Sequence, residues 1–268
     1  MQVRAKKSLG QHFLTDLSIA QRIAETLDEH RHQPTLEVGP GMGVLTEPLL
    51  ERGHDLTVVE LDQESVRYLQ LNFPQLDGRI VPEDFLKLDL RQLYGDRTFN
   101  IIGNYPYNIS SQIFFKVLEY KDQVTCCSGM LQREVAQRIA AAPGSKTRGI
   151  LSVLLQAWYD IEYLFTVDEH VFNPPPKVKS GVIRLTRNNI TDLGCDQRLM
   201  KTVVKTAFGQ RRKTMRNSLR PLLPKASPVL ERDIFGKRPE QLSVSEFIDL
   251  TNMVHDAAQQ YHDNERTE

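Results

Sequence analysis

Asn104, Pro106 and Tyr107 stand in FNIIGNYPYNISS, the chemically most specific motif of the chain. The apolar run ends at Asn104, which predicts this side chain at the carboxyl end of a strand, where open α/β sheets bind ligands. The motif is suited to chemistry on the exocyclic amino group of adenine. That nitrogen is a poor nucleophile because its lone pair is conjugated into the ring. The Asn104 oxygen and a backbone carbonyl fixed by Pro106 are suited to accept both of its N–H bonds, and Tyr107 offers a ring for stacking. A β-turn beside a core tyrosine is the alternative.

A glycine turn in LEVGPGMGVLTEPLL contains Gly39, Gly41 and Gly43. Glycine lets the backbone adopt positive φ and approach a ligand closely. A phosphate loop is excluded because no Gly-Lys-Ser/Thr follows, and Val44 stands where the dinucleotide fingerprint needs its third glycine. Glu60 ends the next apolar run, about 20 residues on, and is suited to hold ribose hydroxyls. The glycine turn and Glu60 together predict a site for a nucleoside cofactor. The glycines alone would also fit a plain strand–helix turn.

Short apolar runs alternate with amphipathic stretches from residue 35 to 187. The runs TLEVG, DLTVVEL, RIVPED, FNIIGN and VTCCSGML predict strands, and residues 44–53 and 63–73 predict helices. A buried helix leading into a strand is expected in ILSVLLQAWYDIEYLFTVDEHVF, and KSGVIRLTR is a further candidate strand. This alternation is typical of a doubly wound, mostly parallel α/β sheet. Its strands would bring the glycine turn and the Asn104 motif to one edge.

The chain beyond residue 188 lacks β-branched runs, and its pattern predicts helices over 196–208, 211–223 and 243–260. Ser243 followed by Glu246 gives the last helix a capping-box start. We therefore expect two domains, an α/β domain with the cofactor site over 1–187 and a small helical domain over 188–268.

A basic run extends from Lys205 to Arg220, with six Lys/Arg and no acid, although the whole chain has a formal net charge of zero. Such a run is suited to nucleic-acid phosphates, which orient a protein without reading the bases. A solvated helix face is the alternative. The candidate RNA-binding residues are Lys205, Arg211, Arg212, Lys213 and Arg216.

The composition, with 40% apolar and 25% charged residues in 268, is ordinary for a globular protein. No apolar run approaches the roughly 20 residues that span a bilayer, so we expect no membrane role. Three cysteines form neither a disulfide framework nor a zinc-ligand spacing. We expect a cytoplasmic protein without a metal site.

Eight segments, taken in order, resemble one family, the bacterial small-subunit ribosomal RNA adenine dimethyltransferases. They cover the chain from about residue 6 to about residue 247, and they are KKSLGQHFL, EVGPGMGVLTEPL, VVELD, EDFLKLD, GNYPYNIS, MLQREVAQRI, VFNPPPKVKS and FGQRRKTMRNSL. The resemblance implies a class I methyltransferase fold with a helical C-terminal domain. It also implies S-adenosylmethionine as methyl donor and dimethylation of N6 of two adjacent adenosines in a hairpin loop of small-subunit ribosomal RNA.

The resemblance also implies roles for individual residues. His12, Leu14 and Gly39, with Gly41 of the same turn, would contact the cofactor, Glu60 its ribose, and Asp84 its adenine amino group, while Asn104 would lie beside the reacting methyl. A carboxylate at position 84 is chemically able to accept from that amino group, although a helix cap or solvated acid is the alternative. Phe172 would face Tyr107 across the target base, and a core phenylalanine is the alternative.

Two positions depart from the family pattern. Tyr105 stands where the family usually has Leu, which is expected to narrow the pocket or add a contact. His12 stands where many relatives have Asn, and we assign it only a cofactor contact.

The mechanism we expect is direct in-line methyl transfer without a covalent intermediate, in which the protein positions the reactants. The target adenine must leave its stack, which costs least in an RNA loop. The expected partner is small-subunit ribosomal RNA in a pre-30S particle, bound by a monomer.

Three alternatives remain open. A large-subunit adenine dimethylase is disfavoured by the segments FGQRRKTMRNSL and RPEQLS. A non-catalytic assembly or transcription factor is disfavoured by the intact motif from Asn104 to Tyr107. A nicotinamide dehydrogenase is disfavoured by Val44.

Overall fold

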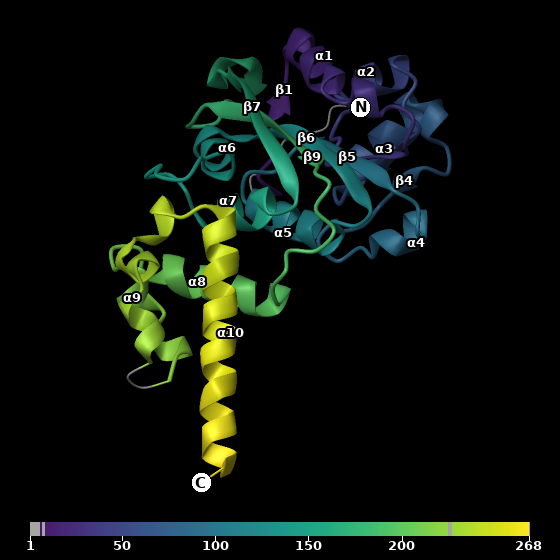
Figure 1. The fold of residues 1–268 in the computed structure, drawn as a ribbon. Coiled ribbons are helices and arrows are strands. Elements are labelled where there is room, and N and C mark those ends of the chain that lie inside the picture. The colour runs from purple at the N-terminus through teal and green to yellow at the C-terminus, as the bar shows by residue number, and fades with distance from the viewer. Residues whose placement is uncertain (1–5, 7–8, 225–226, 268) are drawn as a thin grey trace. The chain divides into compact units, whose positions relative to one another are not determined.

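The computed structural model describes residues 6, 9–224 and 227–267 and divides into two compact units (Figure 1). The first unit contains Met1–Gln137 and Tyr159–Arg187, and the second contains Arg138–Trp158 and Asn188–Glu268. This division differs from the single boundary expected after residue 187, because the segment 138–158 groups with the C-terminal helices.

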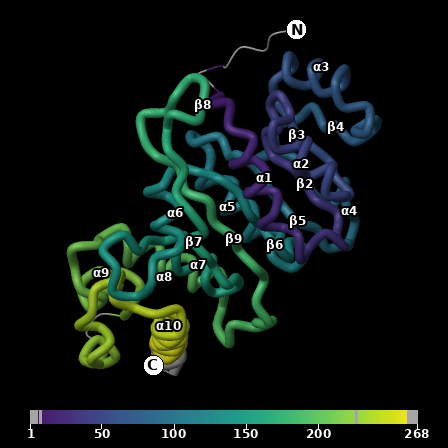
Figure 2. The backbone as a smooth tube through the Cα atoms, turned by 90° about the horizontal axis from the view of Figure 1, so that it is seen from above, coloured from purple at the N-terminus to yellow at the C-terminus, as the bar shows by residue number. Residues whose placement is uncertain are grey.

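A seven-stranded sheet forms the centre of the first unit, in the order β4-β3-β2-β5-β6-β9-β7 (Figure 2). Neighbouring strands from β4 through β6 are parallel, and β9 lies antiparallel to both β6 and β7. The mostly parallel α/β sheet is therefore confirmed. The strands are β2 (Thr35–Val38), β3 (Leu56–Val59), β4 (Ile80–Val81), β5 (Phe99–Asn104), β6 (Val124–Gln132), β7 (Tyr159–Val167) and β9 (Ser180–Arg187).

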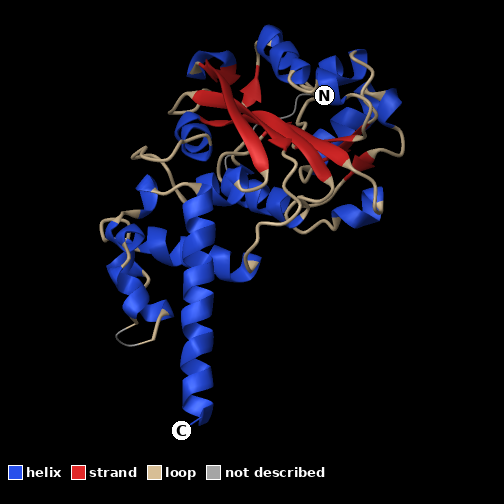
Figure 3. Ribbon diagram, in the orientation of Figure 1, coloured by secondary structure: helices blue, strands red, loops and turns tan. Residues whose placement is uncertain are grey.

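Helices lie on both faces of this sheet (Figure 3). Asp16, Asp62 and Asp89 cap three of them by accepting a backbone N–H in the first turn, which satisfies one of the donors that a helix start leaves unpaired. Strand side chains such as Leu36 and Ile101 are fully buried beneath the helices. The helices are α1 (Leu17–Glu25), α2 (Thr46–Glu51), α3 (Gln63–Asn72), α4 (Leu90–Tyr94), α5 (Ser110–Glu119) and α6 (Arg133–Ile139), of which α6 runs past the end of this unit.

A second sheet consists of two short strands, β1 (Phe13–Leu14) and β8 (Phe172–Asn173), which pair antiparallel. A strand of two residues is too short to show the alternation of apolar and polar side chains, and the two strands are far apart in sequence. Periodicity therefore did not predict this pair. The pairing fixes the segment that carries His12 against the segment that precedes the proline run.

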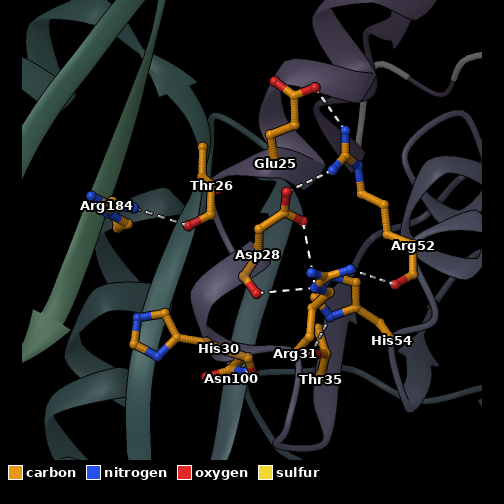
Figure 4. A network of polar contacts seen from close by, with 10 residues as sticks. All are labelled: Glu25, Thr26, Asp28, His30, Arg31, Thr35, Arg52, His54, Asn100 and Arg184. Carbon is orange, nitrogen blue, oxygen red and sulfur yellow. Dashed lines mark hydrogen bonds and ion pairs between the residues drawn. The ribbon is translucent and has the colours of Figure 1, made fainter.

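A network of hydrogen bonds and ion pairs connects the loops at the amino-terminal edge of the sheet (Figure 4). Arg52 bonds to Glu25 and Asp28, each across 2.7 Å, and Asn100 donates to the carbonyl of His30 across 2.9 Å. Partly exposed ion pairs of this kind contribute about 0–1 kcal/mol each. We therefore interpret the network as structural, on the edge opposite to the carboxyl ends of the strands.

The second unit is helical. Asp196 accepts the Leu199 N–H across 2.6 Å at the start of the helix Gln197–Gly209. Ser243 and Glu246 form the expected capping box at the start of the last helix. The helices expected over 196–208 and 243–260 are therefore confirmed at their starts. The helices are α7 (Ile150–Gln156), α8 (Gln197–Gly209), α9 (Met215–Ser218) and α10 (Val244–Thr267).

The prediction of one helix over 211–223 is wrong. Residues 211–213 form a turn, α9 is a single short helix, and Arg220–Leu222 is a 3-10 turn. Pro221 lacks the N–H that an α-helix would need at that position, which explains why α9 ends before it.

Arg148 explains why the segment 138–158 belongs to the second unit. Its side chain is fully buried and donates to the carbonyls of Ala141 and Leu242 and to the Gln156 side chain. Burial lowers the pKa of this guanidinium to about 10. The side chain thereby ties α7 to the chain just before α10, a link that sequence order does not reveal.

Candidate active site

The first unit contains a cavity of about 270 Å³ at the carboxyl ends of β2, β3 and β5. Open α/β sheets bind ligands at this edge. Nine of the residues predicted for the cofactor and the adenine line it, and they are His12, Leu14, Gly39, Gly41, Glu60, Asp84, Asn104, Pro106 and Tyr107. The structure thus brings both predicted motifs to one cavity.

The glycine turn follows β2 directly. Gly39 and Gly41 have φ of +69° and +55°, a conformation that side chains with a Cβ rarely adopt. A Cβ on Gly41 would lie 3.0 Å from Cε1 of Phe13, and a Cβ on Gly39 would lie 3.7 Å from Cδ of Pro106. The turn is therefore closely packed between the N-terminal segment and the adenine motif, and its bare backbone faces the cavity.

Glu60 follows β3 and is 5% exposed. Its two carboxylate oxygens accept the backbone N–H groups of Gly41, across 3.0 Å, and Asp62, across 2.8 Å. Burial raises the pKa of this carboxyl, and the two backbone donors oppose that rise. Each carboxylate oxygen can accept a further bond, so a diol in the cavity could be held here.

Asp84 lies in the loop after β4. Its Oδ1 accepts the backbone N–H of Leu86 across 3.0 Å, and the side chain also lines the cavity. This bond stabilises a loop turn and does not cap a helix, and among the described residues it leaves Oδ2 with only an ion pair to Lys87 across 3.9 Å. One oxygen shapes the loop, and the other can accept from a ligand amino group.

Asn104 ends β5, as expected. Its Nδ2 donates to the backbone carbonyl of His12 across 3.2 Å. A carbonyl cannot donate, so this bond fixes the amide with Nδ2 toward His12 and Oδ1 on the opposite side. Its Oδ1 has no hydrogen-bond donor among the described residues, so the side chain has a free acceptor in the cavity that it lines.

Tyr107 is held on two sides. Its hydroxyl lies 2.5 Å from Oγ of Ser180 on β9, and its ring stacks on the ring of His12 with centroids 5.4 Å apart and planes at 30°. Burial raises the pKa of its hydroxyl, so it stays neutral at ordinary pH. These two contacts thus hold the Tyr107 ring in a fixed orientation near Asn104.

Tyr105, the departure from the family pattern, is 1% exposed. Its hydroxyl donates to the Ser128 carbonyl across 2.7 Å, and its ring stands edge-on to Phe114. A Cβ on Gly103 or on Gly129 would lie within 3.0 Å of the tyrosine ring. These two glycines therefore make room for the larger side chain, which reaches into the core while its residue still borders the cavity.

Phe172 is not among the residues that line the cavity. It pairs with Leu14 across the β1–β8 ladder, is 4% exposed, and packs in the core with Leu14, Ala20 and Ile23. Among the described residues no ring contact joins Phe172 to Tyr107, and the ring that stacks on Tyr107 is that of His12.

Glu37 on β2 was missed by sequence reasoning. It is 1% exposed, lines the cavity and accepts the Thr46 hydroxyl across 2.7 Å. Burial, with a smaller contribution from the charge of Glu60, raises its pKa to about 8. The sequence signal that could have revealed Glu37 is a carboxyl inside an otherwise apolar strand. With its pKa raised in this way, the carboxyl is neutral at pH 7.

The candidate RNA-binding residues lie in the second unit. Lys205, Arg211, Arg212 and Lys213 are exposed, whereas Arg216 is half-buried and donates to the Leu230 carbonyl across 2.9 Å. Arg216 is therefore partly engaged in holding the fold. Arg211 also donates to the Lys146 carbonyl, whereas Arg212 and Lys213 present their charge to solvent, as a phosphate-binding surface requires.

Within the part of the chain that the structure describes, no cluster of His, Cys, Asp and Glu has the geometry of a metal site. The same residues contain no helix long and apolar enough to cross a membrane.

The family model described as "Ribosomal RNA adenine dimethylase" matches residues 2–255. A Ribosomal RNA small subunit methyltransferase A of Parabacteroides distasonis is 70% identical over 249 residues, with 93% of each chain covered. That of Porphyromonas gingivalis is 64% identical over 252 residues, covering 94% of this chain and 98% of the relative.

Two solved structures have a similar fold. A dimethyladenosine transferase from Plasmodium falciparum superposes with a TM-score of 0.77 at 21% identity, over 92% of this chain and 98% of that one. The 23S rRNA methyltransferase ErmE gives a TM-score of 0.65 at 27% identity, over 88% of this chain and 99% of that one. Both similarities extend over most of the length of the two chains compared.

Proposed function

This chain belongs to the ribosomal RNA adenine dimethylase family, and we propose that its cavity is where S-adenosylmethionine and a target adenine meet. The activity is S-adenosylmethionine-dependent dimethylation of adenine in small-subunit (16S) ribosomal RNA. The observation that carries the site assignment is the meeting of the glycine turn, Glu60 and the Asn104 motif in one cavity. When bound, S-adenosylmethionine supplies an electrophilic methyl group on its sulfonium.

The cofactor side of the cavity is formed by the first three parallel strands in the chain and the N-terminal segment. Glu60 would hold the ribose diol with the lone pairs that its two backbone donors leave free. Asp84 would accept from the adenine amino group through Oδ2. Gly39 and Gly41 would let the backbone approach the methionine portion, and His12 and Leu14 would close the cavity from the N-terminal segment.

The substrate side of the cavity is formed by the motif after β5. Asn104 Oδ1 and a backbone carbonyl fixed by Pro106 would accept the two N6–H bonds, which leaves the N6 lone pair free for attack. Tyr107 would support the flipped base by stacking. These groups position N6 and polarise it, so no covalent enzyme intermediate is required.

The RNA substrate we propose is a hairpin loop with two adjacent adenosines near the 3' end of 16S RNA, within a pre-30S particle in the cytoplasm. A loop base costs less to flip into the cavity than a paired one. Lys205, Arg211, Arg212 and Lys213 would bind phosphates, and Arg216 would support them. We propose a monomer, since no described residue of the site requires a second copy.

Two competing functions are less well supported. A large-subunit dimethylase is represented by ErmE at 27% identity, whereas the small-subunit relatives reach 70%. A non-catalytic assembly factor would not need Asn104 fixed as an acceptor beside a stacking ring.

The test is mass spectrometry of ribosomal RNA nucleosides from cells that lack this gene, with and without a plasmid copy. We expect N6,N6-dimethyladenosine to disappear from 16S RNA and to return with the wild-type plasmid. Loss of the nucleoside from 23S RNA instead would support the large-subunit function, and unchanged 16S RNA would overturn the proposal.

A further inference from the structure

Lys116 on α5 is a buried cation outside the cavity. It is 6% exposed, and burial lowers the pKa of its ammonium, whereas the charges of Glu119, Asp89 and Asp84 oppose that change. A buried charge is costly unless protein groups replace the water that it loses. The groups that surround the ammonium therefore indicate what this charge does for the protein.

The ammonium of Lys116 holds the far end of the turn that Asp84 begins. Its Nζ donates to the carbonyl oxygen of Leu86 across 3.2 Å and also to that of Leu88. Carbonyls at the end of a helical turn lack an N–H partner and carry a partial negative charge, so a cation is favourable there. Lys116 therefore stabilises this turn in the loop after β4.

Asp84 is bound to the same turn by three hydrogen bonds. Its backbone carbonyl accepts the N–H groups of Lys87, across 2.9 Å, and Leu88, across 3.1 Å. Its Oδ1 accepts the N–H of Leu86 across 3.0 Å. A shift of the turn would thus also move Oδ2, the oxygen that remains for a ligand.

Two aromatic rings extend the connection between α5 and this loop. Nζ of Lys116 lies 5.4 Å from the ring centre of Phe85 and 5.7 Å from that of Tyr120, distances at which a cation is attracted to a ring. Phe85 lines the cavity. The Tyr120 hydroxyl, just after α5, donates to Asp89 across 2.9 Å. The end of α5 therefore holds the loop over most of its length.

We propose that Lys116 is a positioning residue for the cofactor, which sets the place of the Asp84 carboxylate and thereby the selection of a 6-amino purine. This proposal rests on the proposed function, because it assumes that the adenine of S-adenosylmethionine lies at Asp84. Lys116 does not line the cavity, so it acts through the turn. A 6-amino group can donate to a carboxylate, whereas the 6-oxo group of hypoxanthine cannot.

The test is calorimetric binding of S-adenosylhomocysteine and S-inosylhomocysteine to the full chain. These two ligands differ only in the purine, which carries a 6-amino group in the first and a 6-oxo group in the second. The variants are Lys116→Met, which removes the charge and keeps a long side chain, Asp84→Ala, and the double variant. Lys201→Met is the matched control, because Lys201 is exposed on α8 in the second unit. Melting checks that each variant folds.

We expect the wild type and Lys201→Met to bind S-adenosylhomocysteine about tenfold or more tightly than S-inosylhomocysteine, since one bond to a charged group distinguishes them. In Lys116→Met this preference should fall to within about threefold, chiefly because S-adenosylhomocysteine binds more weakly. Adding Lys116→Met to Asp84→Ala should change the preference no further, because both act on the same bond.

A wild-type preference in Lys116→Met would overturn the proposal. Equal weakening of both ligands would also overturn it, because a purely structural role would loosen the whole site. If Lys116→Met does not fold, Lys116→Gln gives the same test, since its amide is shorter and uncharged. Its preference should also fall, and a wild-type preference there would overturn the proposal. A wild type that binds neither ligand, or both equally, would instead contradict the cofactor assignment of the proposed function, and this proposal with it.

Discussion

The side-chain amide of Asn104 donates to the backbone carbonyl of His12, with 3.2 Å between nitrogen and oxygen. This bond decides which end of the amide is available to a substrate. An adenine amino group needs acceptors, and the structure leaves the Asn104 oxygen free to be one. The N-terminal segment therefore orients the side chain on which we expect the chemistry to depend.

Replacing Asn104 with Ala should slow transfer by about 100- to 1000-fold, because the lost acceptor stabilises N6 most strongly as it becomes pyramidal. Affinity for 30S particles should stay within about twofold, since the bond adds little in the ground state. Single-turnover methylation and filter binding measure the two quantities. Turnover within about threefold of wild type would remove Asn104 from the catalytic role.

Replacing Glu60 with Ala should weaken S-adenosylmethionine binding by about tenfold or more. An unpaired, desolvated ribose diol costs about 1–3 kcal/mol, and the Gly41 and Asp62 N–H groups also lose their acceptor. Calorimetry gives the affinity, and melting checks the fold. Glu51→Ala is the control, because Glu51 is an exposed acid at the end of α2. Equal affinity in Glu60→Ala and wild type would place the ribose elsewhere.

Changing Arg211, Arg212 and Lys213 together to Gln should weaken RNA binding equally for loop sequences with and without the target adenosines, since phosphate contacts carry no base information. The slope of log affinity against log salt should become shallower by about 0.7–0.9 for each phosphate that the variant no longer neutralises. A variant with Arg67, Arg91 and Arg97 changed to Gln removes the same charge from exposed positions of the first unit. The same slope in both variants would mean that the run is only a solvated surface.

The sequence predicted the sheet and most of the cavity because these features are local. The glycine turn, Glu60 and Asn104 each follow an apolar strand, and parallel topology brings strand ends together. The contacts of His12 and Phe172 depend on β1 and β8, which pair across a long stretch of chain with no periodic signal. The place of residues 138–158 depends in the same way on Arg148 and its distant carbonyl partner at Leu242.

Glu37 makes stability depend on pH. Its folded-state pKa is raised to about 8, so between the pKa of an unfolded glutamic acid and about pH 8 the folded protein holds a proton that the unfolded chain has lost. Stability from this group is therefore present at low pH and is lost as pH rises to about 8. Glu37→Gln, which cannot ionise, should lose less stability than wild type between pH 5 and 8, by up to a few kcal/mol.

Urea unfolding of both proteins at intervals from about pH 5 to 9 measures this difference. Glu134→Gln is a suitable control, because Glu134 is an exposed acid near the start of α6. Parallel curves for wild type and Glu37→Gln over this range would contradict the assignment of a neutral carboxyl at position 37.

Tyr107 and Phe172 should behave differently when replaced with Ala. Tyr107 lines the cavity, and a lost stacking surface costs about 1–3 kcal/mol, so Tyr107→Ala should slow transfer by about 5- to 150-fold with nearly unchanged S-adenosylmethionine affinity. Phe172 is buried in the core, so Phe172→Ala should lower the free energy of unfolding by about 3–5 kcal/mol. Phe172→Leu, which keeps most of the volume, should recover much of that loss.

The double variant decides whether the two rings hold one adenine, as the resemblance to the family implied. With Phe172 in the core, its replacement should leave the transfer rate per folded molecule within about threefold, and the double variant should be about as slow as Tyr107→Ala alone. Single-turnover rates well below each melting temperature test this. If Phe172→Ala is as slow as Tyr107→Ala, and the double variant is no slower than either, the effects are non-additive. The rings would then clamp the same base, and Phe172 would have to leave the core position next to Leu14 when RNA binds.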